Sequence, residues 1–310
     1  MKHTARLLAA SLLALTAGWG VSMNAQSRMA LRQLVGDSLC EAVKDINIPL
    51  TSARMAKAQP REAAVPAAVD FGLSVKWADC NVGATSPEHV GTYVAWGGFA
   101  RSDSDFSEIN YEWLDSGEYI NIGDDISRTF YDYATQELGP DWRIPTRAEW
   151  EELINNCGAW TVTTLNGVAG YEVKTDAGSS ESIFLPFGGY YDETDLNYSG
   201  ERGYYHTSTI ATESKSYDVK LNSKECVVRT SARYRGKPIR AVYDPIESPH
   251  GDVVGDGNVN LADARAVIEI LLRGGVGIGQ SALKRADVNG DAVVNITDAD
   301  CVIALIMQGE

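Results

Sequence analysis

The chain has 310 residues, which is enough for two domains that each bury a core of their own. Its formal net charge of −15 argues against a nucleic-acid partner, because phosphate contacts need clustered Lys and Arg. An acidic surface instead suits solubility, calcium sites and polar ligands.

The first 25 residues are typical of a secretory signal peptide. Lys2 and Arg6 precede an apolar run from Leu7 to Ala17, and the predicted cleavage site follows Ala25. A membrane anchor is the alternative, but the run is shorter than the roughly 20 residues that a spanning helix needs. We therefore expect an exported protein, located outside the cell, on its surface or in the periplasm.

Residues 26 to 66 are predicted to be an N-terminal lead-in and linker. Leu31, Leu34 and Val35 have helical spacing within a polar segment, and residues 52 to 69 are rich in Ala and contain two prolines. This composition indicates a segment that is at most partly ordered.

Residues 67 to 243 are predicted to form an α+β domain of short strands and few helices. The expected strands, separated by Gly, Asn and Asp turns, lie in FGLSVKWADCNVG, VGTYVAWGGF, SIFLPFGGYY, GYYHTS, YDVKLNS and KPIRAVY. A helix is expected after Thr146, which forms a capping box with Glu149. The apolar residues at helical spacing are Trp150, Leu153 and Ile154.

Five cysteines remain after signal cleavage, so at least one has no partner within the chain. They lie at positions 40, 80, 157, 226 and 301. Cys80 and Cys157 both belong to patterned segments of the middle domain, and we expect them to form a disulfide or to be two buried free thiols.

The middle domain resembles the Fibrobacter-type major paralogous domain of secreted bacterial proteins. The motifs that carry the resemblance are VDFGLSVKWADCNVGA, GPDWRIPTRAEWEEL, SIFLPFGGYYD, GYYHTST and KPIRAVY. That family is related to the C-type lectin-like and sulfatase-modifying fold, whose members share the R-x-P-T-x-x-E-W motif found here from Arg143 to Trp150. The resemblance implies a C-type lectin-like mixed fold.

The sequence offers no recognised catalytic arrangement. The Glu-Pro-Asn, Gln-Pro-Asp and Trp-Asn-Asp motifs of calcium-dependent lectins are absent, and Cys226 lacks the nearby cysteine that sulfatase-modifying relatives use. Zinc spacings, a G-x-S-x-G elbow and a phosphate-binding glycine loop are also absent. We therefore expect no catalytic residues, and we expect His206 to fill an aromatic slot.

A tyrosine-rich segment, residues 188 to 206, is the candidate ligand site. Aromatic faces beside acids and amides suit sugar rings or peptide surfaces, and polysaccharide is the leading ligand class. Tyr190 and Tyr205 are assigned to the core. The residues assigned to the surface and predicted to bind ligand are Tyr191, Asp192, Asp195, Tyr198 and Arg202.

Two segments near the C-terminus have the ligand spacing of EF-hand calcium loops. Such a loop places oxygen ligands at positions 1, 3, 5, 7, 9 and 12, with Gly at position 6, and position 7 acts through its main-chain carbonyl. In loop 1 (residues 252 to 263) the predicted ligands are Asp252, Asp256, Asn258, Asn260 and Asp263. In loop 2 (residues 287 to 298) they are Asp287, Asn289, Asp291, Val293, Asn295 and Asp298.

Each loop departs from the pattern at one position. Loop 1 keeps Gly257 at position 6 but has the apolar Val254 at position 3. Loop 2 has every ligand but carries Ala292 at position 6, where a positive φ costs a non-glycine residue about 1 kcal/mol. We predict that loop 2 binds calcium more tightly. The alternative is that both segments are acidic turns without metal.

An amphipathic helix is predicted to follow each loop. The apolar residues at helical spacing are Ala264, Val267, Ile268, Leu271 and Leu272 after loop 1, and Ala299, Val302, Ile303, Ile306 and Met307 after loop 2. Pro245 and Pro249 exclude a regular helix before loop 1, so each unit is predicted to be a loop with an exiting helix. Residues 244 to 250 are then a linker.

Residues 251 to 310 resemble a type I dockerin, a small all-α domain with two F-hand loop–helix units. The resemblance implies folding around Ca²⁺ and attachment to a cohesin module of another protein. Dockerin contacts often come from polar residues at loop positions 10 and 11, which are here Leu261, Ala262, Ile296 and Thr297. Three of the four are apolar, so the partner is expected to be a cohesin-like or another protein.

The sequence therefore predicts an exported, non-catalytic binding protein with a lectin-like domain and a calcium-dependent attachment module. One alternative is an adhesive or structural surface protein that binds other proteins. The other is a degenerate enzyme of the sulfatase-modifying type.

Overall fold

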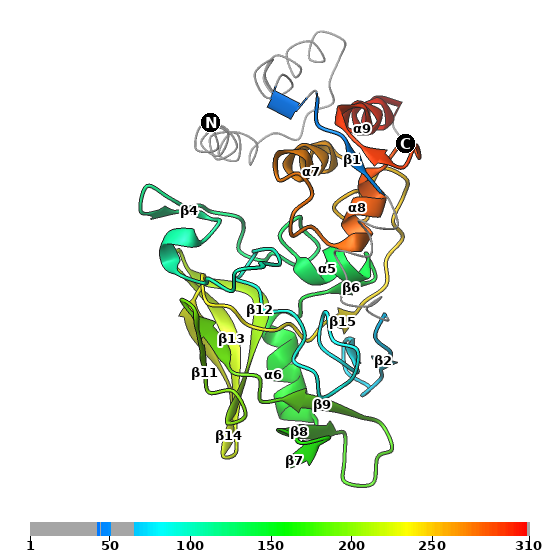
Figure 1. Ribbon diagram of the computed structural model, residues 1–310. Coiled ribbons are helices and arrows are strands. Elements are labelled where there is room, and N and C mark those ends of the chain that lie inside the picture. The colour runs from blue at the N-terminus through cyan, green and yellow to red at the C-terminus, as the bar shows by residue number, and fades with distance from the viewer. Residues whose placement is uncertain (1–41, 44, 51–64, 309–310) are drawn as a thin grey trace.

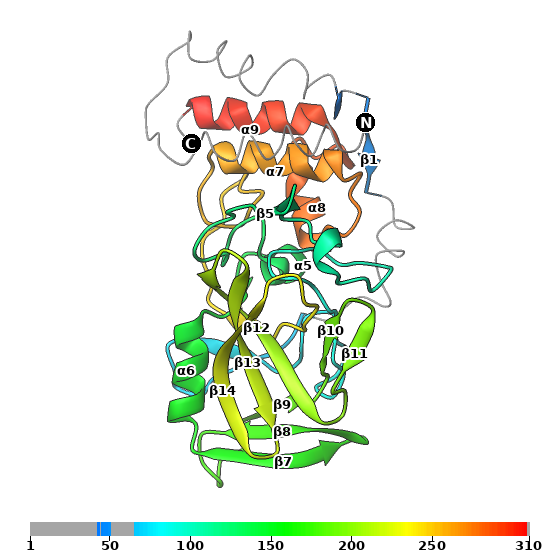
Figure 2. The ribbon, with the colours of Figure 1, turned by 90° about the vertical axis from the view of Figure 1, so that its left-hand side faces the viewer.

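The computed structural model describes residues 42–43, 45–50 and 65–308, and the predicted signal peptide lies outside these residues. Two helices lie side by side at one end of the molecule, and short antiparallel sheets occupy the other end (Figure 2). None of the described helices is long and apolar enough to cross a membrane.

The middle domain is built from short antiparallel sheets, which confirms its mixed α+β character. One sheet has the order β2 (Ala68–Val69), β3 (Lys76–Ala78), β15 (Val242–Tyr243) and β6 (Trp142–Arg143). Two meanders follow, β7 (Ala159–Leu165), β8 (Val168–Lys174) and β9 (Ser182–Pro186), then β12 (Arg202–Thr212), β13 (Lys215–Asn222) and β14 (Glu225–Ala232). The first sheet joins the two ends of the domain, because β2 and β15 both flank β3.

Smaller elements complete the domain. They are the 3₁₀ turn η1 (Glu108–Asn110), the hairpins β4 (Leu114–Asp115) with β5 (Glu118–Tyr119) and β10 (Tyr190–Asp192) with β11 (Asp195–Asn197), and α5 (Tyr133–Leu138). The strand expected in residues 90 to 99 does not form. In its place Val94 makes an isolated antiparallel bridge with Lys237.

Helix α6 (Arg147–Asn156) begins where the sequence predicts. Thr146 Oγ1 accepts from the main-chain N–H of Glu149, and the Glu149 carboxylate accepts from the Thr146 N–H, which completes the capping box. Trp150 and Leu153 are buried, and the Trp150 ring lies 4.7 Å from that of Trp77. The apolar stripe therefore anchors α6 to the core.

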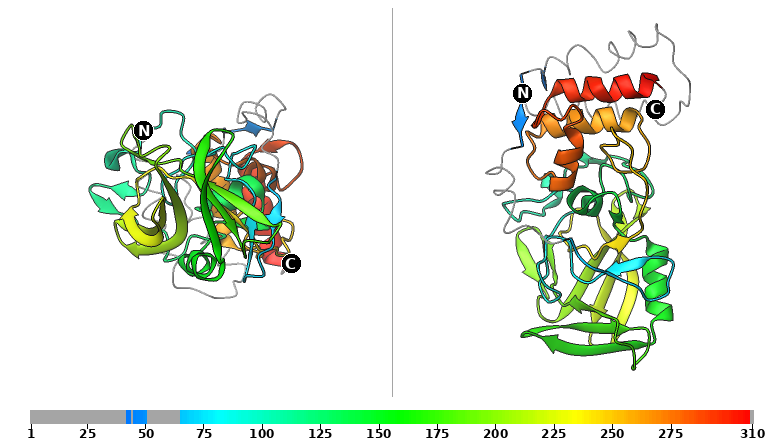
Figure 3. Two further views of the ribbon diagram at one scale, coloured as in Figure 1. Left: turned by 90° about the horizontal axis from the view of Figure 1, so that it is seen from below. Right: turned by 90° about the vertical axis from the view of Figure 1, so that its right-hand side faces the viewer.

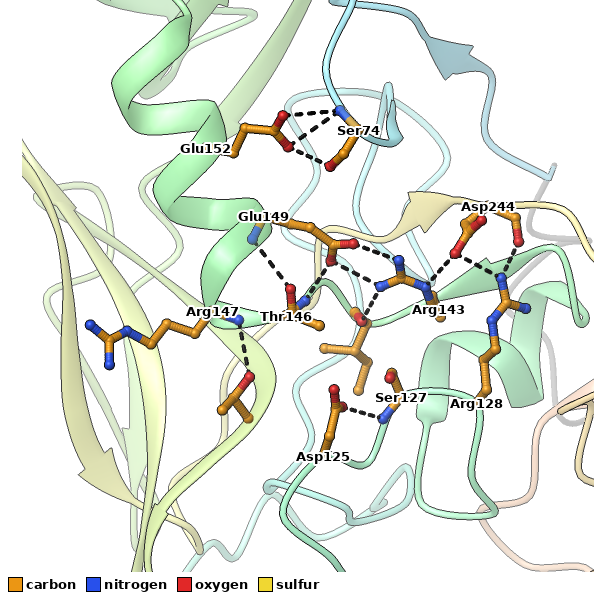
Figure 4. A network of polar contacts seen from close by, with 12 residues as sticks. Ser74, Asp125, Ser127, Arg128, Arg143, Thr146, Arg147, Glu149, Glu152 and Asp244 are labelled. Carbon is orange, nitrogen blue, oxygen red and sulfur yellow. Dashed lines mark hydrogen bonds and ion pairs between the residues drawn. The ribbon is translucent and has the colours of Figure 1, made fainter.

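The R-x-P-T-x-x-E-W motif has a structural role that Figure 4 shows. Arg143 on β6 donates from Nη1 to Glu149 Oε2 at 2.9 Å and from Nε to Asp244 Oδ2 at 3.0 Å. Arg128 forms a second ion pair with Asp244 at 3.1 Å. These half-buried charge pairs join β6, the start of α6 and the segment after β15.

The preferred disulfide between Cys80 and Cys157 is wrong, and the alternative of two buried free thiols is confirmed. Burial raises the pKa of the Cys80 thiol to about 12, with the Asp79 carboxylate adding to the shift. Both side chains therefore behave as small apolar groups in the core.

The C-terminal domain contains the two predicted helices, α7 (Leu261–Leu272) and α9 (Ile296–Gln308), and they pack on each other. Residues 244 to 250 contain no helix, as the prolines predict. The prediction of a loop plus exiting helix is wrong for loop 2, because α8 (Gln280–Ala286) leads into it.

One hydrophobic cluster, the shared core, extends across the two domains, and a second cluster around Trp77 and Trp150 lies within the middle domain. Helix α8 packs on α5 of the middle domain, between that domain and the α7–α9 pair (Figures 1 and 3). The contact is close, because a Cβ at Gly279 would lie 2.5 Å from the Gln136 carbonyl. A single cluster of buried side chains includes Trp113 and Tyr133 as well as Ile278 and Leu283. The C-terminal domain is therefore packed against the middle domain and is not only connected to it by the linker.

Part of the predicted lead-in, residues 42–43 and 45–50, packs on the C-terminal domain. Strand β1 (Ile48–Pro49) pairs antiparallel with β16 (Val293–Val294), which is part of loop 2. Val43 and Ile48 are buried in the shared core. The chain thus returns from its N-terminal region to its C-terminal domain (Figure 1).

Candidate calcium loops and ligand surface

Loop 1 is organised around the carboxylate at position 1. Asp252 Oδ1 accepts from the main-chain N–H groups of Gly255 at 2.7 Å and Asp256 at 3.0 Å, and Oδ2 accepts from Gly257 at 2.9 Å. Gly257 has φ of 86°, which is the left-handed conformation predicted for position 6. The backbone is thus wrapped around one buried carboxylate.

The position 12 carboxylate closes loop 1. Asp263 Oδ1 accepts from the Val254 N–H and Oδ2 from the Asn260 N–H, both at 2.9 Å. Burial, together with the neighbouring carboxylates of Asp252 and Asp256, raises the pKa of Asp263 to about 6. A cation at this place would compensate the crowded negative charge.

Loop 2 repeats the position 12 arrangement. Asp298 Oδ1 accepts from the Asn289 N–H at 3.1 Å, and Oδ2 accepts from the Asn295 N–H at 2.8 Å. Ala292 adopts φ of 64°, so the strained conformation predicted at position 6 is present. The duplication therefore extends from the sequence to individual hydrogen bonds.

One carboxylate oxygen at position 1 of loop 2 accepts no hydrogen bond from the described residues. Asp287 Oδ2 accepts from the Ala292 N–H at 2.9 Å, but within the described part of the chain the buried Oδ1 of Asp287 has no hydrogen-bond partner. A buried carboxylate oxygen without a donor is costly, and a hard cation would satisfy it. The residues of loop 2 therefore fit Ca²⁺.

The ligands must include more than carboxylates. No three His, Cys, Asp or Glu side chains among residues 42–43, 45–50 and 65–308 form a group that could hold a metal. The amides of Asn260, Asn289 and Asn295 and the position 7 carbonyls would supply the remaining oxygens. Such an oxygen-only set suits Ca²⁺ and does not suit zinc.

The surroundings explain the apolar residue at position 3 of loop 1. Val254 is only 4% exposed and belongs to the core shared with the middle domain. A Cβ at the neighbouring Gly255 would lie 2.9 Å from Thr135 of α5, and Arg285 of α8 donates to the Val253 carbonyl at 3.1 Å. Loop 1 therefore gives up a ligand position to the domain interface.

The predicted partner-binding positions lie at the starts of α7 and α9. Ala262 and Thr297 at position 11 are exposed, whereas Leu261 and Ile296 at position 10 are half-buried. Ile296 packs against the shared core. The exposed pair is thus the part of this set that another protein can reach.

The tyrosine-rich segment differs from its predicted division into core and surface. Tyr191 was expected on the surface, but it is half-buried, with its ring 4.9 Å from that of Tyr93 and 5.5 Å from that of Phe106. Tyr190 is half-buried and not a core residue, whereas Tyr205 is fully buried as predicted. The alternation of tyrosines with polar residues in the sequence does not predict which tyrosines the β10–β11 hairpin turns toward the domain.

The surface of this hairpin is made of stacked Tyr and Arg side chains. The Arg202 guanidinium lies 3.9 Å above the Tyr198 ring, which also stacks on Tyr190 at 6.2 Å. Asp192 pairs with Arg235 at 2.7 Å, and Asp195 is exposed. The predicted ligand residues are therefore brought together, except that Tyr191 faces inward.

A surface depression adjoins the same hairpin. It has a volume of about 540 Å³, and its lining includes His89, Phe187, Ser199 and Gly200. Glu88 also lines it and accepts from the Asn166 amide at 2.9 Å. No sequence pattern marked this place, because its walls come from four separate segments.

Of the two side chains considered for catalysis, His206 is buried and Cys226 is half-buried. His206 is 1% exposed, its Nε2 lies 2.8 Å from the Val94 carbonyl, and burial lowers its pKa to about 3. It fills an interior slot, as predicted. Burial also raises the pKa of the Cys226 thiol to about 12, which keeps this thiol protonated at neutral pH.

Residues 250–307 match the model of the family described as the dockerin type I domain. No curated protein and no solved structure matches the chain. The match supports the C-terminal dockerin and its affinity for calcium. The C-type lectin-like fold of the middle domain stays a prediction.

Proposed function

We propose that this protein is an exported, non-catalytic binding protein that carries a ligand-recognition domain and is attached to a cohesin-like module through its dockerin domain. The observation that carries the proposal is the duplicated loop, in which Asp263 and Asp298 hold equivalent main-chain groups. The family match at residues 250–307 supports the same role.

Calcium supports attachment by fixing the ends of the helices that face the partner. The loop residues Asn260 and Asn295 accept from the N–H groups of Ala262 and Thr297, both at 2.8 Å, so loop geometry and the exposed helix starts are coupled. One cation bound by Asp252 and Asp263 in loop 1 and another bound by Asp287 and Asp298 in loop 2 would fix these helix starts in one conformation.

Attachment is tested with residues 26 to 310 immobilised on a sensor and type I cohesin modules in solution. We expect binding in calcium and loss of binding in a chelator, and we expect Thr297→Arg to weaken it. The control is Val162→Arg, an exposed position on β7 far from the loops in sequence. Binding that is unchanged by chelator would contradict the proposal.

Polysaccharide is the proposed ligand of the middle domain. The support is the hairpin with Tyr198, which is 42% exposed, beside Arg202 and Asp195, together with the adjoining depression. Aromatic faces bordered by polar groups bind sugar rings by stacking and hydrogen bonds. A glycan array probed with the full mature chain tests this ligand class.

Substitution at the hairpin sharpens the glycan test. We expect Tyr198→Ala to reduce glycan retention, whereas Ile109→Ala, at a position 84% exposed outside the hairpin, leaves it unchanged. Retention of a protein in place of a glycan would favour an adhesive protein. Turnover that is lost in Cys226→Ser would favour an enzyme.

A further inference from the structure

The N-terminal strand contacts loop 2 through its main chain. The register pairs Ile48 with Val294 and Pro49 with Val293, and the Leu50 N–H donates to the Ala292 carbonyl at 2.8 Å. The paired residues are positions 7 and 8 of loop 2, and Ala292 is position 6. The strand therefore holds the half of the loop that contains its strained residue.

The register keeps the position 7 carbonyl available for a cation. The bond from Leu50 to Ala292 identifies Pro49 and Val293 as a non-hydrogen-bonded pair of the antiparallel ladder. In such a pair both residues direct their main-chain polar groups away from the partner strand. In agreement, the Val293 N–H turns into the loop and donates to Asp291 Oδ1 at 2.8 Å.

Apolar side chains fix this segment to the C-terminal domain. Val43 and Ile48 are 0% and 1% exposed, and Ile46 and Leu50 pack against the same core. The strand thus has its own hydrophobic anchor and does not depend on main-chain hydrogen bonds alone.

We propose that residues 45–50 form a built-in strand that sets the conformation of loop 2, so that strand docking and cation binding in loop 2 strengthen each other. The strand takes over the role of the glycine that loop 2 lacks, because it restrains Ala292 in its positive φ. The coupling is reciprocal, since each event favours the same loop conformation. This inference rests on calcium binding by loop 2.

The test compares two buried isoleucines of the same hydrophobic core in residues 26 to 310. Ile48→Ala weakens the anchor of the strand, and Ile126→Ala, at a position 0% exposed in the middle domain, is the matched control. Both variants carry Asp263→Ala, so that calorimetric titration with CaCl₂ reports loop 2. We expect Ile48→Ala to weaken calcium binding about tenfold and Ile126→Ala to leave it unchanged.

A second variant removes only the main-chain contact. Leu50→Pro deletes the N–H that donates to the Ala292 carbonyl, and we expect it to weaken calcium binding as well. This variant keeps the test possible if Ile48→Ala does not fold. Hydrogen exchange gives the reciprocal readout, because calcium should slow exchange at the Leu50 and Val294 amides. Normal calcium affinity in both strand variants overturns the coupling and leaves the attachment function intact. Absence of calcium binding in the parent protein overturns both.

Discussion

The two predicted calcium loops share the hydrogen bonds of their position 12 carboxylates, but they differ at position 1 and in their surroundings. Loop 1 lies against the middle domain, which buries Val254 and leaves little room at Gly255. Loop 2 exposes Asn289, Asp291 and Ala292 and is backed by strand β1. The comparison shows that each departure from the loop pattern lies where another part of the chain packs against that loop.

This difference gives the loops separate tasks. Loop 1 connects the domains and gives up one ligand for an interface contact. Loop 2 keeps a predicted ligand at every position and contains a strained residue whose carbonyl accepts a hydrogen bond from the strand segment. The predictions below test this comparison of the two loops, beginning with the largest expected effect.

Restoring the missing ligand of loop 1 should damage the protein. Val254→Asp places a carboxylate in the shared core, and an unpaired buried charge typically costs several kcal/mol, so we expect the free energy of unfolding to fall by about 3 kcal/mol or more. The matched change Asn289→Val, at the exposed position 3 of loop 2, should alter it by less than about 0.5 kcal/mol. Urea unfolding in chelator measures both, and equal losses would remove the distinction between the loops.

Acid should destabilise the middle domain through His206, independently of either loop. Its pKa is lowered from 6.5 to about 3, so the folded state binds its proton far less readily than the unfolded state. The contribution of neutral His206 to the free energy of unfolding is fully present above pH 6.5 and is lost as the pH falls toward 3. At pH 5 the loss amounts to about 2 kcal/mol.

The His206 effect separates pH from calcium. In urea unfolding at pH 7.5 and pH 5, His206→Asn should lack this part of the pH dependence, and the parent should show it both in calcium and in chelator. A pH dependence that vanishes in chelator would assign it to the loops instead.

Removal of the position 12 carboxylate should affect the loops unequally. Asp298→Ala and Asp263→Ala are matched, because each carboxylate holds two main-chain N–H groups in the same way. Since loop 2 keeps all its ligands, we expect Asp298→Ala to reduce the tighter calcium affinity at least tenfold, about 1.4 kcal/mol, and Asp263→Ala to reduce affinity less. Equal losses in calorimetric titration would reverse the ranking.

The smallest effect is expected from exchanging the residues at position 6. Ala292→Gly relieves about 1 kcal/mol of strain at φ of 64° and should raise the affinity of loop 2 a few-fold. Gly257→Ala introduces a similar strain at φ of 86° and should lower the affinity of loop 1 by a similar factor. Calcium titration of both variants measures these affinities. If Ala292→Gly left the calcium affinity of loop 2 unchanged, β1 would already compensate the cost of the positive φ at Ala292.

Several features were predictable from the sequence because they depend on neighbouring residues. The capping box of Thr146 and Glu149 fixes the start of α6, and the acid spacing of loops 1 and 2 fixes two turns with positive φ at Gly257 and Ala292. The stripes on α7 and α9 predict their mutual packing. In each case the determining contacts lie within about one turn of the chain.

Other features were decided only by the tertiary structure. The sequence by itself determined the loops, their helices and the mixed α+β character of the middle domain. It contained no local signal for the pairing of Ile48 with Val294, for the burial of Val254 against the middle domain, or for the inward turn of Tyr191. These contacts join residues far apart in the chain, and their stability comes from apolar surface that is buried only when distant segments meet.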